Sequence, residues 1–382
     1  MSQPPVRPPL FPSPASIPTL STEMAESTSK VSLPFVNTVN TFGLNILSHA
    51  LALNPSKSVG LCAMNIYHCL SMIAAGSKNR NLAAFAQVLR FTPELLDTMV
   101  TNTLTLDRYS KSSPSVELSS ASGVFPAKDF VLGEQWKKLM EETFEAEIGA
   151  LELNPINTFI ERETKGKFKD LIKPEDIAGA VLMLVTCLYF KASWASTFKK
   201  RSTKKDVAFF TFAGEEKKVA MMHKCEKIEY VQDARCQVAI LPYESGDTGP
   251  KWKAAVILPK EKGQDAMKSL LDSFTTSPDY LRNLIAGSAP ISKSSPSRLR
   301  GDIGARRMQK VDLHLPRFSL KVTLDLIPGL SQLGLSPVFS PSEDFAPIST
   351  GPLMISRATH DLFLEVNEEG TEVAAVTVVT MR

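Results

Sequence analysis

The sequence predicts an α+β fold, and three observations support this class. Apolar residues recur at helical spacing through the N-terminal part of the chain, which indicates amphipathic and buried helices. An uncharged run of twelve residues, 179–190, is shorter than the roughly twenty residues that cross a bilayer and predicts a central strand buried on both faces. A second uncharged segment, 373–381, is rich in Val, Thr and Ala and predicts another strand.

Five segments carry the helical pattern. The segment 61–75 is apolar almost all round, so it predicts a buried helix that ends at Gly76. The other four have a single apolar face, and the last of them begins at the helix-starting pair Asn154 and Pro155. These four segments are 33–50, 82–89, 134–148 and the stretch from Asn154 to about Gly166. Between them, 116–125 has the character of a strand.

Length and composition are those of a globular protein. The 382 residues are 43% hydrophobic and 22% charged, which is enough to build a sizeable core. The 43 basic and 40 acidic residues leave a net charge of only +3, so we expect neither nucleic acid nor a membrane as the main partner. By length alone the chain would hold two or three average domains or one large one.

Residues 1–30 contain seven prolines among many Ser and Thr residues. Such a segment cannot bury enough apolar surface to order itself, so we predict a disordered tail. It lacks the positive start and the continuous apolar run of a secretory signal. We therefore expect a cytoplasmic or other intracellular location. An organelle transit peptide stays open, because no acidic residue precedes Glu23.

The residue types that carry chemistry are scattered along the chain. No CxxC pair, zinc-like spacing, GxSxG, HExxH, Walker or GxGxxG motif occurs, so we expect no metal, no cofactor and no enzymatic activity. An unrelated enzyme stays as a minor alternative, because residues distant in sequence can meet in space. The cysteines are Cys62, Cys69, Cys187, Cys225 and Cys236, and the histidines are His49, His68, His223, His314 and His360.

The segment 286–310 is rich in Ser, Gly, Pro and basic residues. It predicts an inserted loop in water rather than a polyanion site, because a basic run alone has no aromatic or base-reading geometry. Its basic residues are Lys293, Arg298, Arg300, Arg306, Arg307 and Lys310.

The C-terminal segment divides into a charged turn and an uncharged strand. Residues 367–370, Asn-Glu-Glu-Gly, predict a turn or hinge in which Gly370 is free to take a positive φ that other residues resist. Side chains alternate in a strand, so Glu372 and Arg382 share one face while the other face carries no charge. This pattern predicts one face buried in a sheet and the other near solvent. Taken alone, it is typical of the last strand of an ordinary sheet.

Several ordered stretches resemble one known family. EVNEEGTEVAA, from Glu365, resembles the hinge of the reactive-centre loop of serpins, a family of suicide protease inhibitors. The stretches SASGVF, LMLVTCLYFKASWASTF, VDLHLPRFSL and LSQLGLSPVFSPSEDFAPIS resemble its strands and helices in the same order. The resemblance covers 33–382. It implies a single domain, 31–382, with a large mixed central sheet, smaller sheets and about eight or nine surrounding helices.

The resemblance also implies a function. A serpin traps serine endopeptidases, and in some members cysteine endopeptidases: the protease attacks an exposed loop, forms an acyl-enzyme, and is carried along as the freed loop inserts into the main sheet. The implied partner is the target protease, and we expect a monomer. Family analogy also leaves an extracellular location open. The implied hinge residues are Glu368, Glu369, Gly370, Thr371, Glu372, Val373, Ala374 and Ala375. The implied breach and shutter residues, beside the place of insertion, are Trp194, Thr186, Asn65 and His360.

Departures from the family pattern leave a non-inhibitory or truncated binding protein as the alternative. Val373 and Val376 stand where inhibitory members favour small residues, and branched side chains would slow entry of the loop. The stretch 62–66, Cys-Ala-Met-Asn-Ile, replaces Ser-Pro-Leu-Ser-Ile, and Thr186 replaces Asn. The family pattern would also continue past Arg382, so we expect the chain to end within the reactive-centre loop, in the segment 367–382, without the C-terminal strands.

Overall fold

The structure is a computed structural model that describes residues 32–54, 57–111, 115–211, 214–247, 249–286 and 307–382. The residues from Val31 to Arg382 form one compact unit. The predicted tail, 1–30, and most of the predicted basic loop, 287–306, lie outside the described residues.

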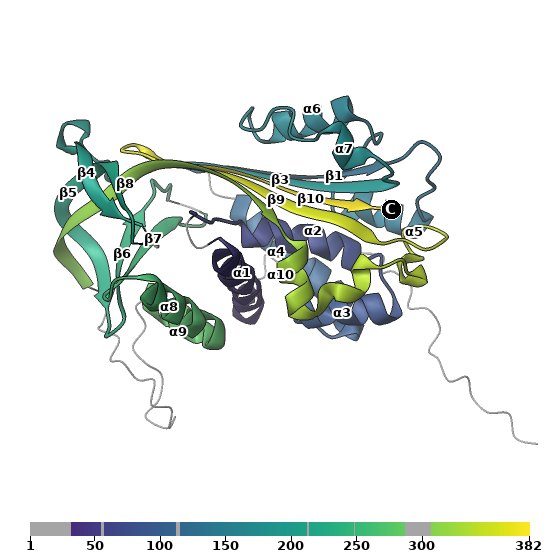
Figure 1. Cartoon of the computed structure of the whole chain (residues 1–382), viewed down its shortest axis with the longest axis horizontal. Coiled ribbons are helices and arrows are strands. Elements are labelled where there is room, and N and C mark those ends of the chain that lie inside the picture. Colours follow the sequence, from purple (N-terminus) through teal and green to yellow (C-terminus); the bar gives the residue numbers. More distant parts are fainter. Residues whose placement is uncertain (1–31, 55–56, 112–114, 212–213, 248, 287–306) are drawn as a thin grey trace, which may run out of the picture. The chain divides into compact units, whose positions relative to one another are not determined.

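A mixed sheet of ten strands forms the centre of this unit (Figure 1). Its strand order is β2-β1-β3-β10-β9-β8-β5-β6-β7, and β4 pairs with β5 off this path. The sheet confirms the predicted α+β class. The strands are β1 Glu117–Pro126, β2 Glu147–Ile148, β3 Leu182–Ser193, β4 Lys204–Phe210, β5 Glu216–Gln232, β6 Cys236–Pro242, β7 Lys253–Pro259, β8 Arg307–Asp325, β9 Ile355–Val366 and β10 Gly370–Met381.

Ten α-helices are assigned among the described residues, and four of the five predicted segments coincide with one of them. The helix predicted for 134–148 is shorter, because the chain passes from α5 into a π-helical turn and Glu145 then takes a φ of 52°, which a right-handed helix cannot accommodate. The helices are α1 Leu33–Leu53, α2 Ala63–Ala74, α3 Asn79–Leu89, α4 Leu96–Lys111, α5 Glu134–Lys138, α6 Leu153–Glu163, α7 Pro174–Ile177, α8 Gln264–Thr276, α9 Pro278–Ala286 and α10 Ile327–Leu330.

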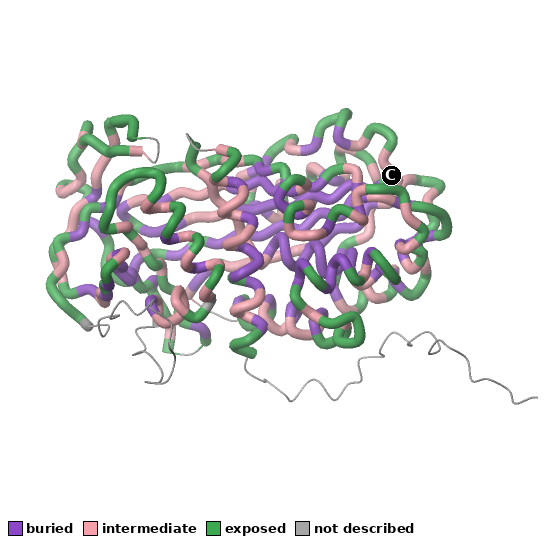
Figure 2. The backbone as a smooth tube through the Cα atoms, turned by 60° about the horizontal axis from the view of Figure 1, so that its bottom comes forward, coloured by how far each residue is buried: buried purple, intermediate pink, exposed green. Residues whose placement is uncertain are grey.

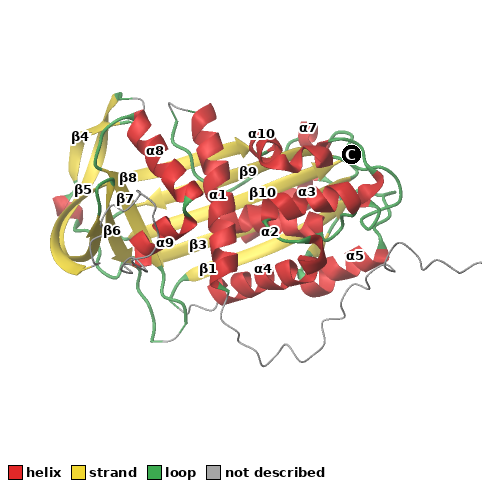
Figure 3. Cartoon of the chain, turned by 90° about the horizontal axis from the view of Figure 1, so that it is seen from below, coloured by secondary structure: helices red, strands yellow, loops and turns green. Residues whose placement is uncertain are grey.

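Helices cover both faces of the sheet at β3 and β10. α6 and α7 lie on one face (Figure 1), while α1, α2, α3 and α4 lie on the other (Figure 3). On the α6 face, Ile156 and Phe159 share a buried cluster with Val185 and Val376. The two covered faces produce the dense band of buried residues at the centre of Figure 2.

The strand β3 confirms the prediction made from its uncharged run, since each of its residues from 182 to 190 is buried. The prediction for β10 is wrong in one respect. We expected one buried face, whereas every residue from Ala374 to Met381 is buried. β10 lies between β3 and β9 rather than at an edge, so the helices on both sides cover it as completely as they cover β3.

Candidate functional site

Asn367, the first residue of the turn that precedes β10, closes this turn with hydrogen bonds. The Asn367 side-chain Oδ1 accepts hydrogen bonds from the backbone N–H groups of Glu369 and Gly370 at 2.9 and 3.1 Å. The Asn367 N–H donates to the Gly370 carbonyl at 3.1 Å. Side chains of Asn commonly close turns in this way. The predicted turn therefore connects β9 and β10 as a tight hairpin, and both strands lie in the same sheet.

Gly370 is required by close packing and not by its φ angle. The structure gives positive φ values at seven other described glycines, but not at Gly370, so the turn does not use the conformational freedom that we expected of this glycine. A Cβ atom at this position would lie 2.0 Å from the Ala192 carbonyl oxygen and 3.0 Å from the Ser193 Cα. Because those are backbone atoms of the neighbouring strand, they cannot move aside as a flexible side chain would. Glycine thus allows β10 to begin directly against β3.

An aromatic pair holds both sides of the turn. The Trp194 and Tyr243 rings are stacked, with centroids 4.6 Å apart and planes 10° from parallel. The Trp194 Nε1–H donates to the Asn367 carbonyl at 2.9 Å, and the Tyr243 hydroxyl donates to Thr371 Oγ1 at 2.8 Å. Such a pair stabilises its surroundings through ring packing and through its polar ends. Trp194 therefore contacts the turn directly before the start of β10.

The three acidic residues of the hinge have different surroundings. Glu368 is buried, and its carboxylate accepts a hydrogen bond from Thr203 Oγ1 at 2.7 Å and faces Arg317 at 3.7 Å. Burial acts to raise its pKa, but the Thr203 hydrogen bond and the Arg317 charge outweigh burial, so the pKa is lowered. By contrast, Glu369 is exposed and pairs with Lys200 at 2.7 Å.

Glu372 shows how a charge is accommodated inside β10. Its carboxylate accepts hydrogen bonds from Lys167 Nζ at 2.8 Å and from the Tyr189 hydroxyl at 2.7 Å. Burial again acts to raise the pKa of Glu372, and these two donors lower it overall. The pairing explains why a strand in the middle of the sheet can carry a carboxylate.

The remaining hinge residues are apolar and enter the core. Ala374 and Ala375 have no exposed surface, and Val373 is partly buried. Ala375 and Val373 belong to the buried cluster on the helix α2 side, whereas Ala374 and Val376 belong to the cluster on the α6 side. The alternation of side chains in a strand sends neighbouring residues to opposite cores.

A buried polar chain crosses the middle of β10. Thr377 Oγ1 donates to Asn65 Oδ1 at 2.6 Å and lies 2.8 Å from His360 Nδ1. His360 Nε2 accepts the backbone N–H of Cys62 at 3.0 Å, so Nε2 carries no proton and the neutral ring donates from Nδ1 to Thr377. Burial lowers the His360 pKa to about 3, which keeps the ring neutral. From the Cys62 N–H through His360 and Thr377 to Asn65 Oδ1, each donor therefore faces an acceptor.

The structure brings three of the four predicted shutter and breach residues together. Thr186 lies opposite Thr377 in the β3–β10 register, and its Oγ1 donates to the Asn65 carbonyl at 3.3 Å. Asn65, Thr186 and His360 therefore surround Thr377, while Trp194 is in the separate aromatic pair. The sequence reasoning did not single out Thr377 or Tyr243. The signal for Thr377 was present, since it places a hydroxyl at the centre of the uncharged segment 373–381.

The family model described as serpin, serine protease inhibitor, matches residues 37–382. The chain belongs to the serpin family. The expected resemblance is therefore confirmed, and so is the serpin-like single-domain fold. At the level of the family, serpins inhibit proteases and do not act as catalysts.

Relatives and solved structures agree with this assignment. The chain is 26% identical to a protein named antitrypsin from Bombyx mori over 351 residues, covering 89% of this chain and 82% of that one. The structure of reaction loop cleaved lamprey angiotensinogen matches with a TM-score of 0.75 and 26% identity, covering 91% of this chain and 98% of that one. Thyroxine-binding globulin complexed with a thyroxine conjugate matches in fold, with a TM-score of 0.77, 22% identity, and 92% and 99% coverage.

Among the described residues, no helix is both long enough and apolar enough to span a bilayer.

Proposed function

We propose that this serpin is a suicide inhibitor of serine endopeptidases, with cysteine endopeptidases as a second target class. The observation that carries the proposal is the position of β10. The segment that resembles the family's hinge and proximal loop pairs along its length with β3 on one side and β9 on the other. The main sheet can therefore accept this segment as a central strand, which is the conformational change that the inhibitory mechanism needs.

Insertion of the segment is strongly favourable. It pairs the backbone on both edges, and it removes Val376, Val378, Val379 and Met381 from water. Each such side chain contributes about 1.5–3 kcal/mol when fully buried. The compact Ala374 and Ala375 precede them and need little space to enter.

The chemistry belongs to the protease. Its nucleophile attacks a carbonyl carbon in the loop, the peptide bond breaks, and the new amino terminus departs with the leaving segment. The acyl-enzyme ester stays attached to the loop. If β10 inserts before water hydrolyses the ester, the protease is carried along and held in a distorted state. The serpin contributes no catalytic group, only the free energy of strand insertion.

The test is a covalent complex that survives denaturant. The protein isolated from its native source is incubated with a panel of serine and cysteine endopeptidases and analysed by denaturing electrophoresis and mass spectrometry. We expect a band that contains both chains. Ala374→Arg places a charge at a position with no exposed surface and should convert the inhibitor into a substrate that is cleaved without a complex.

Val131→Arg is the control, since Val131 is 75% exposed and should leave complex formation unchanged. The absence of any stable complex across the panel would overturn the proposal.

A second candidate is a binding protein of serpin fold that does not inhibit proteases. Val373 and Val376 support it, because branched side chains in the entering segment slow insertion relative to hydrolysis. Under this alternative the loop is cut by proteases, but the cut protein gains no thermal stability. Comparing unfolding midpoints before and after cleavage separates the two functions.

A further inference from the structure

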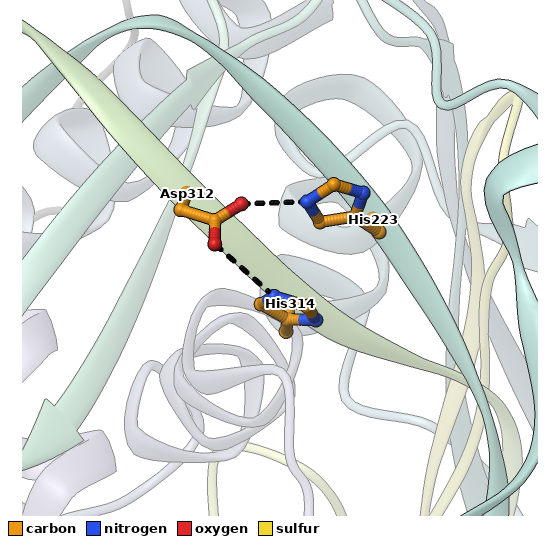
Figure 4. A group of neighbouring side chains, drawn as sticks. All are labelled: His223, Asp312 and His314. Atoms are coloured by element: carbon orange, nitrogen blue, oxygen red, sulfur yellow. Dashed lines mark hydrogen bonds and ion pairs between the residues drawn. The ribbon is translucent and has the colours of Figure 1, made fainter.

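A cluster of two histidines and an aspartate lies on the seam between β5 and β8 (Figure 4). His223 of β5 pairs directly with His314 of β8 in the antiparallel register. Asp312 is two residues before His314, so its side chain emerges on the same face of the sheet. The three residues therefore project together, although His223 and Asp312 are 89 positions apart in sequence.

The side chains already converge on one another. His223 Nε2 lies 2.6 Å from Asp312 Oδ1, and His314 Nε2 lies 3.5 Å from Asp312 Oδ2. The two imidazole rings are 4.6 Å apart between centroids. One ligand atom from each residue falls within 4.8 Å of the others. Three donor atoms so close together can surround a single ion.

The distances suit a small divalent transition metal. Zn²⁺ binds imidazole nitrogen and carboxylate oxygen at about 2.0–2.2 Å, so neighbouring ligand atoms of a tetrahedral site lie about 3.4 Å apart. The His314–Asp312 distance of 3.5 Å matches this spacing. The shorter His223–Asp312 contact must lengthen by less than about 1 Å, which side-chain rotation supplies without moving the backbone.

The donor set and its exposure favour Zn²⁺ over Mg²⁺ or Ca²⁺. Two imidazoles and one carboxylate are typical ligands of zinc, whereas the harder ions prefer oxygen alone. His223, Asp312 and His314 have side chains that are 34%, 65% and 51% exposed, so an ion can reach them from solvent.

We propose that His223, Asp312 and His314 form a Zn²⁺ site that bridges β5 and β8, with solvent completing the coordination. The site is separate from the inserted strand and from the proposed reaction with a protease. Because the three ligands come from two strands, the ion would join those strands through their side chains. An ion that binds only the folded protein also raises its thermal stability.

One neighbouring group needs a control. Cys225 is exposed and lies directly opposite Asp312 in the register, on the same face of the sheet. A free thiol can bind zinc by itself or oxidise during an assay. Cys225→Ser removes this complication and provides the background in which the three proposed ligands are tested.

The experiment measures Zn²⁺ affinity by calorimetry and the thermal unfolding midpoint with and without Zn²⁺, under reducing conditions. We expect Cys225→Ser to bind one Zn²⁺ per chain and to unfold at a higher temperature when the metal is present. In this background His223→Ala, His314→Ala and Asp312→Asn should each lower the affinity by more than about tenfold. Lys310→Ala, two positions before Asp312 on the same face, is the matched control and should not lower it.

Two results would overturn the proposal. One is Zn²⁺ binding that is lost in Cys225→Ser alone, which assigns the metal to the thiol. The other is an equal Zn²⁺ affinity in the three ligand variants and in Lys310→Ala. This result would mean that the three side chains are only an exposed hydrogen-bonded group and do not bind the metal. Folding of each variant is checked in the absence of metal by its unfolding midpoint, so loss of structure cannot be mistaken for loss of a ligand.

Discussion

The two ends of β10 are held in the sheet by different forces. At the hinge, Glu368, Glu369 and Glu372 contact basic residues and hydroxyl groups, and Glu369 is exposed with its partner Lys200. From Ala374 onward every side chain is buried to Met381, and the polar Thr377 is satisfied within the core. Within the hinge, the Glu369–Lys200 pair can exchange its contacts with water, whereas Glu368 and the body of the strand are buried.

In the mechanism that we propose, this difference indicates which contacts stabilise the inserted strand. Polar contacts that water can replace contribute little net stability, so loss of the exposed Glu369–Lys200 pair should cost little. Burial and complete hydrogen bonding in the body stabilise β10 within the sheet, so in the proposed mechanism insertion would be difficult to reverse. Substitutions in the body should therefore have large effects, and those at the exposed part of the hinge small ones.

The largest effect is expected for a charge in the body. Val376→Asp places a carboxylate at a site with no exposed surface in the cluster on the α6 side, and should destabilise the inserted state by about 3–5 kcal/mol. Denaturant unfolding of the purified protein measures the change. Val131→Asp, at a 75% exposed site, should change stability by less than about 0.5 kcal/mol. Equal effects at the two sites would mean that β10 is not buried.

The next effect is a dependence on pH that comes from His360. The His360 pKa is about 3 in the folded protein and its ordinary value is 6.5. Between these two values, His360 is protonated in the unfolded chain and neutral in the folded protein. Stability should therefore fall as the pH drops from 6.5 towards 3, by about 2 kcal/mol between pH 7 and pH 5. In His360→Gln, the difference in bound protons between the unfolded and folded states should be smaller by about one, so stability should fall less steeply as the pH drops. Burial also lowers the His68 pKa, so His68 contributes to the same loss of stability at low pH. Measuring His68→Gln in the same way separates its contribution from that of His360.

A smaller effect is expected when the buried polar chain is interrupted. Thr377→Val keeps the shape of the side chain but leaves Asn65 Oδ1 and His360 Nδ1–H without their partner, at a cost of about 1–3 kcal/mol. A double-mutant cycle with Asn65→Ala isolates the contact. The two substitutions together should cost less than the sum of their separate costs, and strict additivity would show that the contact contributes nothing.

The smallest effect is expected at the exposed end of the hinge. Glu369→Gln and Lys200→Ala break a pair in which both side chains are more than two-thirds exposed. Since solvent screens such pairs, neither substitution should shift the unfolding midpoint measurably, and added salt should leave the comparison with wild type unchanged. A clear shift from either variant would place part of the stabilisation at the hinge and weaken the contrast between the two ends.

Local patterns in the sequence determined much of this fold. The uncharged run of β3, the helices α1, α2 and α3, and the extended character of β10 follow from periodicity and residue preference over short windows. Motif resemblance singled out Asn65, Thr186 and His360, and the structure brings these three residues together around Thr377. Their breach and shutter roles stay predictions. For these elements, residues close in sequence were enough, whereas the helix expected over 134–148 proved shorter than its local pattern predicts.

Only the tertiary structure decided which neighbours meet across the chain. Both faces of β10 are buried because α2 and α6 lie on opposite sides of it, and alternation of charges along the strand cannot reveal that. Thr377 reaches Asn65 across 312 positions, and His223 meets Asp312 across 89. Gly370 is explained by a backbone atom of Ala192 rather than by its own turn. In each case the deciding contact is made by residues that only the folded sheet brings together.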